Sequence, residues 1–134
     1  MVKAKKTKQL SFSLPSKIGL LAEVSAFITT GNINIEAICA YETGDQGLFM
    51  LMTDNYKKTK KILSYMGVEV GVDDIITVEM PNKVGSLQKV AKIISDAGID
   101  INYIYGSPVK GKMTLILKTA NDKKAVTVLN RRSS

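Results

Sequence analysis

The sequence repeats itself at a fixed offset of 66 residues. Without any gap, residues 14–38 (LPSKIGLLAEVSAFITTGNINIEAI) lie over residues 80–104 (MPNKVGSLQKVAKIISDAGIDINYI). The identical pairs are Pro15/Pro81, Lys17/Lys83, Gly19/Gly85, Leu21/Leu87, Val24/Val90, Ile28/Ile94, Ile33/Ile99, Ile35/Ile101 and Ile38/Ile104. Matching at one offset indicates two copies of one supersecondary unit. The 134 residues therefore form two small modules, each of which buries only a thin core by itself.

Both copies begin with the same two predicted elements. Alternating apolar and polar residues predict a first strand at 9–14 and at 75–80, and a short loop with Pro and Gly follows each. Helices are predicted at about 18–30 and 84–96, where apolar residues recur at i, i+3 and i+7. This spacing predicts one apolar stripe that faces a sheet. Its members are Leu21, Val24, Ile28, Leu87, Val90 and Ile94.

Two further strands and a second helix follow in each copy. Turn residues and renewed alternation separate these elements. The first helices stop at Gly31-Asn32 and Gly98, and the second strands start at Ile33 and Ile99. Hairpin turns at Gly44-Asp45 and Lys110-Gly111 lead into third strands at 48–53 and 113–119. The second helices follow Asn55 and Asn121.

The order β-α-β-β-α-β, found twice, predicts an α+β fold of two tandem ferredoxin-like modules with antiparallel sheets and helices on one face. We place the modules at residues 1–71 and 72–134. Val68-Glu69-Val70 gives the first module a short fourth strand. The second module lacks this final strand, because only residues 131–134 remain after its last helix. Its edge is left open, or another segment or chain fills it. Each sheet's other face needs cover from the sister module or a partner subunit, which predicts a homo-oligomer such as a dimer.

Composition excludes several classes of function. The chain has no histidine, which excludes Ser-His-Asp and Cys-His mechanisms and His-ligated metal sites. Its one cysteine, Cys39, cannot form an internal disulfide. No apolar run is long enough to span a bilayer, and the lysine-rich start lacks the apolar core of a signal peptide. These features predict a cytoplasmic protein without a metal or other cofactor.

The net charge of +7 raises the question of nucleic acid. Its distribution does not favour that partner, because residues 1–70 carry nine lysines against six acidic residues and 71–134 carry ten basic residues against six. The lysines cluster at 3–8 and at 57–61. We interpret the first cluster as a frayed tail and the second as a solvated helix face.

Both copies place the pattern P-x-K-x-G between the first strand and the first helix. The backbone N–H groups at a helix start point outward with the positive end of the helix dipole, so they suit a carboxylate or a phosphate. Gly19 and Gly85 have no Cβ, which lets a ligand or another backbone approach closely. The alternative, that Pro and Gly only shape a tight loop, carries equal weight.

A second pair of polar residues stands at the start of the second strands. Asn34 and Asp100 could accept hydrogen bonds from an ammonium group, while the helix start donates to a carboxylate. Within one module this strand start lies near the far end of the helix, away from the loop. Two modules related by a two-fold axis would bring the two features together. Alternatively, Asn34 and Asp100 are ordinary turn residues at a strand entry.

The stretches SKIGLLAEVSAFITTGNINI and NKVGSLQKVAKIISDAGIDI resemble ACT domains. That family's pattern is Asn/Asp-x-x-Gly-x-Leu, an apolar helix, and then Gly-Ile/Val-Asn-Ile. The second copy follows it from Asn82, with Asp100 in place of Asn, whereas the first has Ser16 in place of the leading Asn. The two copies span about 9–130, and the resemblance is closest to stand-alone tandem ACT proteins without an attached enzyme.

The resemblance implies a non-enzymatic regulatory protein that binds a free amino acid at module or subunit interfaces. It also implies a partner that the protein regulates, such as an enzyme, a transporter or a transcription factor. Carried over by motif position, the ligand-binding candidates are Ser16, Ile18, Gly19, Leu20 and Asn34 in the first copy and Asn82, Val84, Gly85, Ser86 and Asp100 in the second. The shorter Ser16 side chain predicts that the two sites are unequal.

Four alternatives use the same topology. An RNA-recognition module needs aromatic side chains on its inner strands, and the third strands offer only Phe49. A metal carrier needs paired cysteines. An enzyme would have to rely on Lys17 and Lys83, the only ionisable loop residues that repeat. A protein-protein interaction module would use the fold without a ligand.

Overall fold

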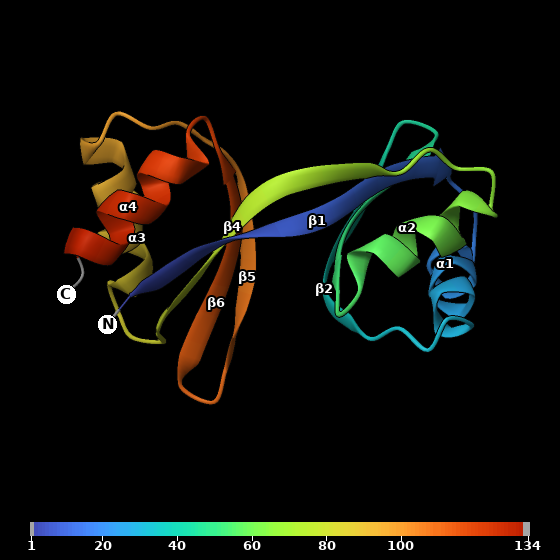
Figure 1. Ribbon diagram of the computed structural model, residues 1–134, viewed down its shortest axis with the longest axis horizontal. Helices are drawn as coiled ribbons and strands as arrows, with labels where there is room; N and C mark the ends of the chain where they lie inside the picture. Colours follow the sequence, from blue (N-terminus) through green and yellow to red (C-terminus); the bar gives the residue numbers. More distant parts are fainter. Residues whose placement is uncertain (1, 133–134) are drawn as a thin grey trace. The chain divides into compact units, whose positions relative to one another are not determined.

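The structure is a computed structural model that describes residues 2–132 of the chain (Figure 1). Ten elements follow one another along the sequence. They are β1 (Lys3–Pro15), α1 (Leu20–Thr29), β2 (Ile35–Thr43), β3 (Gln46–Thr53), α2 (Tyr56–Ser64), β4 (Gly71–Pro81), α3 (Ser86–Asp96), β5 (Ile101–Val109), β6 (Lys112–Thr119) and α4 (Asp122–Arg132). Their order confirms the predicted α+β fold, with a tandem pair of split βαβ modules.

Two long strands, β1 and β4, each serve both modules. Hydrogen-bonded neighbours follow the order β2-β3-β1-β4-β6-β5, and β1 and β4 run side by side in Figure 1. The chain divides into one compact unit from Lys8 to Asp73 and another that joins the residues up to Thr7 to those from Asp74 onward. We call these the first and second modules. The start of β1 thus supplies the second module's fourth strand, and the start of β4 supplies the first module's.

The lysine-rich start of the chain is therefore a strand, and its interpretation as a frayed tail is wrong. Val2 and Ala4 are 7% and 5% exposed and belong to the core of the second module. Lys3 and Lys5 alternate with them and point to solvent. The expected module range 1–71 differs from the structure at this segment, because these residues fill the sheet edge that the sequence order left without a strand.

The side chain of Asn130 in α4 hydrogen-bonds to the backbone of this fourth strand. The Ala4 N–H donates to Asn130 Oδ1 over 2.8 Å, and Asn130 Nδ2 donates to the Ala4 carbonyl over 2.9 Å. One amide side chain therefore hydrogen-bonds both backbone groups of Ala4. This contact blunts an edge that would otherwise offer unpaired groups to another strand.

The fourth strand of the first module does not lie at Val68-Glu69-Val70 as expected. These residues are outside any strand, and pairing begins at Gly71. Val70 is instead a buried core residue at 7% exposure. A Cβ on Gly71 would meet Ser11 Oγ at 3.1 Å, which shows how closely the start of β4 approaches β1.

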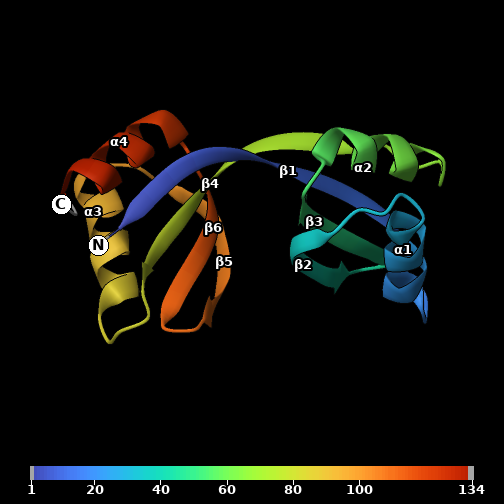
Figure 2. The ribbon, with the colours of Figure 1, turned by 60° about the horizontal axis from the view of Figure 1, so that its bottom comes forward.

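In each module, two helices cover one face of the sheet (Figure 2). The predicted stripe is correct for its inner members but wrong for Leu21 and Leu87, which are 54% and 49% exposed. Leu20 takes the buried position in α1, and Ile93 joins the buried face of α3. The buried side of α1 follows Leu20, Val24 and Ile28 at i, i+4 and i+8. Leu20 fits there because Gly47 on β3 has no side chain to meet it.

The second module carries one carboxylate with a perturbed pKa. Burial of the Asp122 carboxylate raises its pKa, but hydrogen bonds from Thr119 and Lys118, with the Lys118 charge, lower it more, so the pKa lies below the ordinary 3.8. The Thr119 hydroxyl donates over 2.7 Å and Lys118 Nζ over 2.9 Å. A depressed folded pKa contributes stability that is present above the unfolded pKa and lost as pH falls through the folded one.

We expect Asp122→Asn to lower the free energy of unfolding at about pH 7 by about 1–2 kcal/mol, because charge-assisted hydrogen bonds are lost. The deficit relative to the wild type should begin to shrink as the pH falls below the ordinary 3.8, where the unfolded chain takes up its proton, and should vanish only below the lower pKa of the folded carboxyl. Urea titrations at about pH 7 and about pH 3 measure both values. An equal deficit at both would contradict the role given to the Asp122 charge.

Candidate functional site

Each first helix starts from a glycine in the left-handed conformation. Gly19 has φ 84° and Gly85 has φ 88°, and neither helix has a side-chain cap. A Cβ at either position would meet no atom within 4 Å. Glycine is therefore required by the backbone angle, which other residues rarely adopt. The space that the missing side chains would fill is open.

These helix starts leave backbone donors unused. The Leu20 N–H donates to the Lys17 carbonyl over 3.2 Å, and Ser86 donates in the same way to Lys83 over 3.1 Å. The N–H groups of the two residues before each helix make no hydrogen bond within residues 2–132. These are Ile18, Gly19, Val84 and Gly85. Exposed N–H groups at a helix start favour an anionic group such as a carboxylate.

In the first module, the loop is tied to the hairpin between β2 and β3. The Ser16 N–H donates to the Asp45 carbonyl over 2.8 Å, and the Ser16 hydroxyl donates to the Glu42 carboxylate. Lys17 Nζ lies 2.7 Å from Glu23 Oε2 in an exposed ion pair. The polar side chains of this loop therefore already have partners in the same module.

In the second module, the same positions have different charges. The Asn82 N–H donates to the Gly111 carbonyl over 2.9 Å, which repeats the backbone tie. Pro108 stands where the first copy has Glu42, and Lys89 stands where it has Glu23. Among the described side chains, Lys83 and Lys89 have no ion-pair partner. The second loop is thus the more positively charged of the two.

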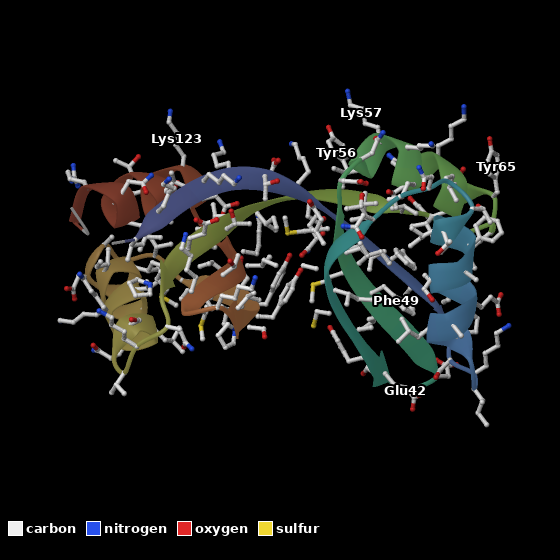
Figure 3. All side chains as sticks on the ribbon, turned by 90° about the horizontal axis from the view of Figure 1, so that it is seen from below. Glu42, Phe49, Tyr56, Lys57, Tyr65 and Lys123 are labelled. Carbon is white, nitrogen blue, oxygen red and sulfur yellow. The ribbon has the colours of Figure 1, made fainter. Side chains whose placement is uncertain are left out.

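An open groove of about 340 Å³ lies beside the first loop. The loop and the first turn of α1 form one wall, and the end of β2 with the start of β3 forms the other. Of the predicted residues it includes Ser16, Gly19 and Leu20, but not Ile18. Sequence reasoning missed Tyr41 and Glu42, which also line it. Glu42 is labelled in Figure 3 near the end of β2. No motif marks these two residues, because the second copy has Ser and Pro there.

The other predicted loop residues separate into exposed and buried side chains. Ile18 and Val84 are fully exposed, at 104% and 108%. Leu20 is buried at 8%, and its Cδ2 would lie 2.7 Å from a Cβ on Gly47. Leu20 therefore packs in the core and offers the groove little. The second copy has the smaller Ser86 at this position and Met113 at the position of Gly47.

Asn34 and Asp100 lie at the opposite end of each module from the glycine loops. The Asn34 N–H donates to Asp54 Oδ1 over 3.2 Å, and the Asp54 N–H donates back to the Asn34 carbonyl over 3.2 Å. The Asp100 carbonyl accepts from the Ala120 N–H over 2.9 Å. Their side chains are exposed beside the loop that leads into the second helix. No module brings them to its own glycine loop.

Other chemistry finds little support in the described part of the chain. No group of three His, Cys, Asp or Glu side chains could hold a metal ion within it. Phe49 is 4% exposed and stacks on Phe12 with ring centroids 4.9 Å apart, so it cannot receive an RNA base. Between residues 2 and 132, no helix is long and apolar enough to cross a membrane.

Comparisons with known proteins point in one direction. The model of the family described as "ACT domain pair" matches residues 5–133. Protein BT0572 from Bacteroides thetaiotaomicron has a crystal structure with a TM-score of 0.91 and 30% identity, and the match covers 97% of this chain and 90% of that chain. No curated protein matches the sequence.

Two more distant structures share the fold. The ligand-free regulatory subunit of aspartate kinase from Thermus thermophilus has a TM-score of 0.70 at 16% identity, covering 97% of this chain and 95% of that one. Aspartokinase III from E. coli, in complex with lysine and aspartate, has a TM-score of 0.58 at 16% identity, covering 97% of this chain and 31% of that one. At this identity the likeness concerns the arrangement of the elements only.

Proposed function

Because this chain belongs to the family of ACT domain pairs, we propose that it is a regulatory protein that binds a free amino acid and thereby modulates a partner. The amino acid is the input, and a regulated enzyme or transcription factor receives the signal. This proposal assigns the chain no catalytic step of its own.

The observation that carries the proposal is the duplicated glycine loop. Each copy presents two backbone N–H groups that have no acceptor among residues 2–132, at the positive end of a helix, in open space. An α-carboxylate matches this arrangement because it accepts several hydrogen bonds and carries a negative charge. The E. coli protein of the same fold was crystallised with lysine and aspartate, which supports an amino acid as the ligand class.

The ammonium group of the ligand needs acceptors. Beside the first loop, the Glu42 carboxylate lines the groove but already accepts from the Ser16 hydroxyl, and the second copy has Pro108 at that position. Asn34 and Asp100 have suitable oxygens, but each lies far from the glycine loop of its own module. We therefore propose that a second copy of the chain brings one of these residues to the loop. A homodimer would then be part of the binding site and would add no separate function.

The experiment is a thermal-shift screen of the purified protein against each common amino acid at millimolar concentration. A ligand at about 100 times its dissociation constant should stabilise the protein by about 2.7 kcal/mol. We expect a clear shift for one chemical group of amino acids. A flat panel with a folded protein would contradict the proposal and favour an interaction module without a ligand.

Substitution of the loop glycines tests the site. We expect Gly19→Val or Gly85→Val to abolish the ligand-induced shift of its own module, because a β-branched residue at positive φ distorts the helix start. The strain should also cost about 1–2 kcal/mol of stability. Ligand titration by calorimetry, with the number of sites fitted, measures the loss.

Gly67→Val is the matched control for this strain. Gly67 has φ 73°, and a Cβ there would meet no atom within 4 Å, yet it follows α2 and takes no part in a glycine loop. We expect this variant to lose similar stability and to bind normally. If all three variants bound as the wild type does, the site assignment would be wrong even though the amino-acid proposal could stand.

A further inference from the structure

Among residues 2–132, the largest concentration of unpaired positive charge lies on α2. Four of the nine residues in this helix are lysines, namely Lys57, Lys58, Lys60 and Lys61, and all four are exposed. Their ammonium groups make no ion pair or hydrogen bond with any described residue, and the first turn of the helix has no acidic side chain. Figure 3 shows Lys57 projecting from α2.

This arrangement works against the helix that carries it. Lys57 lies one turn from Lys60 and Lys61, so like charges face each other at i, i+3 and i, i+4. Lysines at the start of a helix also oppose its dipole, which favours negative charge there. Of the four, only Lys61 lies in the last turn, where the dipole favours positive charge. The other three gain nothing from the helix dipole, and the fold alone does not explain them.

The duplicated helix shows that the fold does not need these charges. At the positions of Lys60 and Lys61, α4 has Val126 and Thr127. The lysine that corresponds to Lys58 is used internally, because Lys124 Nζ donates to the Ala97 carbonyl over 2.9 Å. The same helix is thus built without the charges of Lys60 and Lys61, although α4 keeps Lys123 where α2 has Lys57.

We propose that the exposed face of α2 is a docking surface for an acidic segment of a partner protein. Lys57 to Lys61 span about 6 Å along the helix at about 1.5 Å per residue, which matches a small cluster of carboxylates. A protein that contacts about 6–10 phosphates of a nucleic acid needs a longer row of positive charges than this helix offers. Tyr65 follows Lys61 by one turn, is 68% exposed and projects outward in Figure 3. It supplies the aromatic contact that protein interfaces favour.

The test uses a fluorescein-labelled octaglutamate peptide and fluorescence anisotropy at low salt, with the full-length protein. In Lys60→Gln/Lys61→Gln, two charges leave the surface while helix propensity is kept. The control, Lys5→Gln/Lys6→Gln, removes the same charge from exposed positions of β1. We expect the α2 variant to bind at least about fivefold more weakly and the control to stay within about twofold of the wild type.

Three results would overturn the proposal. Equal weakening by both variants would mean that the peptide senses only net charge. If the wild type did not bind the peptide, an acidic segment could not be the ligand of this surface. Tighter binding of an eight-nucleotide single-stranded DNA, lost in the α2 variant, would make the surface a nucleic-acid site instead. Circular dichroism and thermal unfolding of both variants verify that the protein stays folded.

Discussion

Removal of residues 1–7 is expected to destabilise the second module by at least about 3 kcal/mol while the first module stays folded. The deletion takes away the fourth strand of the second module, the buried side chains of Val2 and Ala4, and both backbone partners of Asn130. The first module uses β1 only from Lys8 onward, so its sheet remains complete. The deletion should therefore destabilise the second module and leave the stability of the first unchanged.

Hydrogen exchange measured by mass spectrometry tests whether only the second module loses stability. Amides of α3, β6 and α4 should lose protection, and those of α1, β3 and α2 should keep it. The uncovered edge of β4 should also promote association with other chains, which size-exclusion chromatography detects. Uniform loss of protection in both modules, or none in either, would contradict the role assigned to the start of β1.

Asn130→Ser removes the two hydrogen bonds between the Asn130 side chain and Ala4 while the strand at residues 3–7 stays in place. Ser64 occupies the corresponding position in α2, so serine is compatible with this helix. The Ala4 N–H and carbonyl would lose their partners, and we expect a loss of about 1–3 kcal/mol. The effect should be smaller than that of the deletion and should disappear when residues 1–7 are already absent.

Gly106→Ala is, after the deletion of residues 1–7, the second change with a large expected effect on stability. A Cβ at this position would lie 2.4 Å from the Thr114 carbonyl oxygen and 3.0 Å from Leu115 Cα. Both neighbours are backbone atoms of β6, so β5 would have to move away from its partner strand. We expect a loss of about 3 kcal/mol in the free energy of unfolding, at the upper end of overpacking costs.

The duplication provides the matched control for Gly106. Ala40 holds the corresponding position in β2, opposite Phe49, and its methyl group is accommodated there. Ala40→Gly should cost only about 0.5–1 kcal/mol, because glycine loses more backbone freedom on folding. Urea unfolding of both variants gives the comparison. A Gly106→Ala protein as stable as Ala40→Gly would mean that β5 and β6 do not approach as closely as the structure has them.

Several features could be predicted from the sequence because their causes are local. The offset of 66 residues predicted two copies, and the periodicity of the apolar residues predicted the order of strands and helices in each. The turns at Gly44 and Lys110 are present and have positive φ, as turn chemistry requires. The P-x-K-x-G pattern located both glycine loops, and the family match over residues 5–133 confirmed the resemblance to ACT domains.

Other features depend on contacts between residues far apart in the sequence, and only the tertiary structure decided them. Nothing near Val2 or Ala4 in the chain indicates that they fill an edge beside residues from Asp74 onward, because a strand acquires its partner only when the sheet assembles. The buried face of α1 includes Leu20 because Gly47 on β3 leaves room for it. The apolar period alone was equally compatible with Leu21. Periodicity specifies which kind of element a segment forms, whereas the partner that each face or edge receives depends on the shape of the rest of the chain.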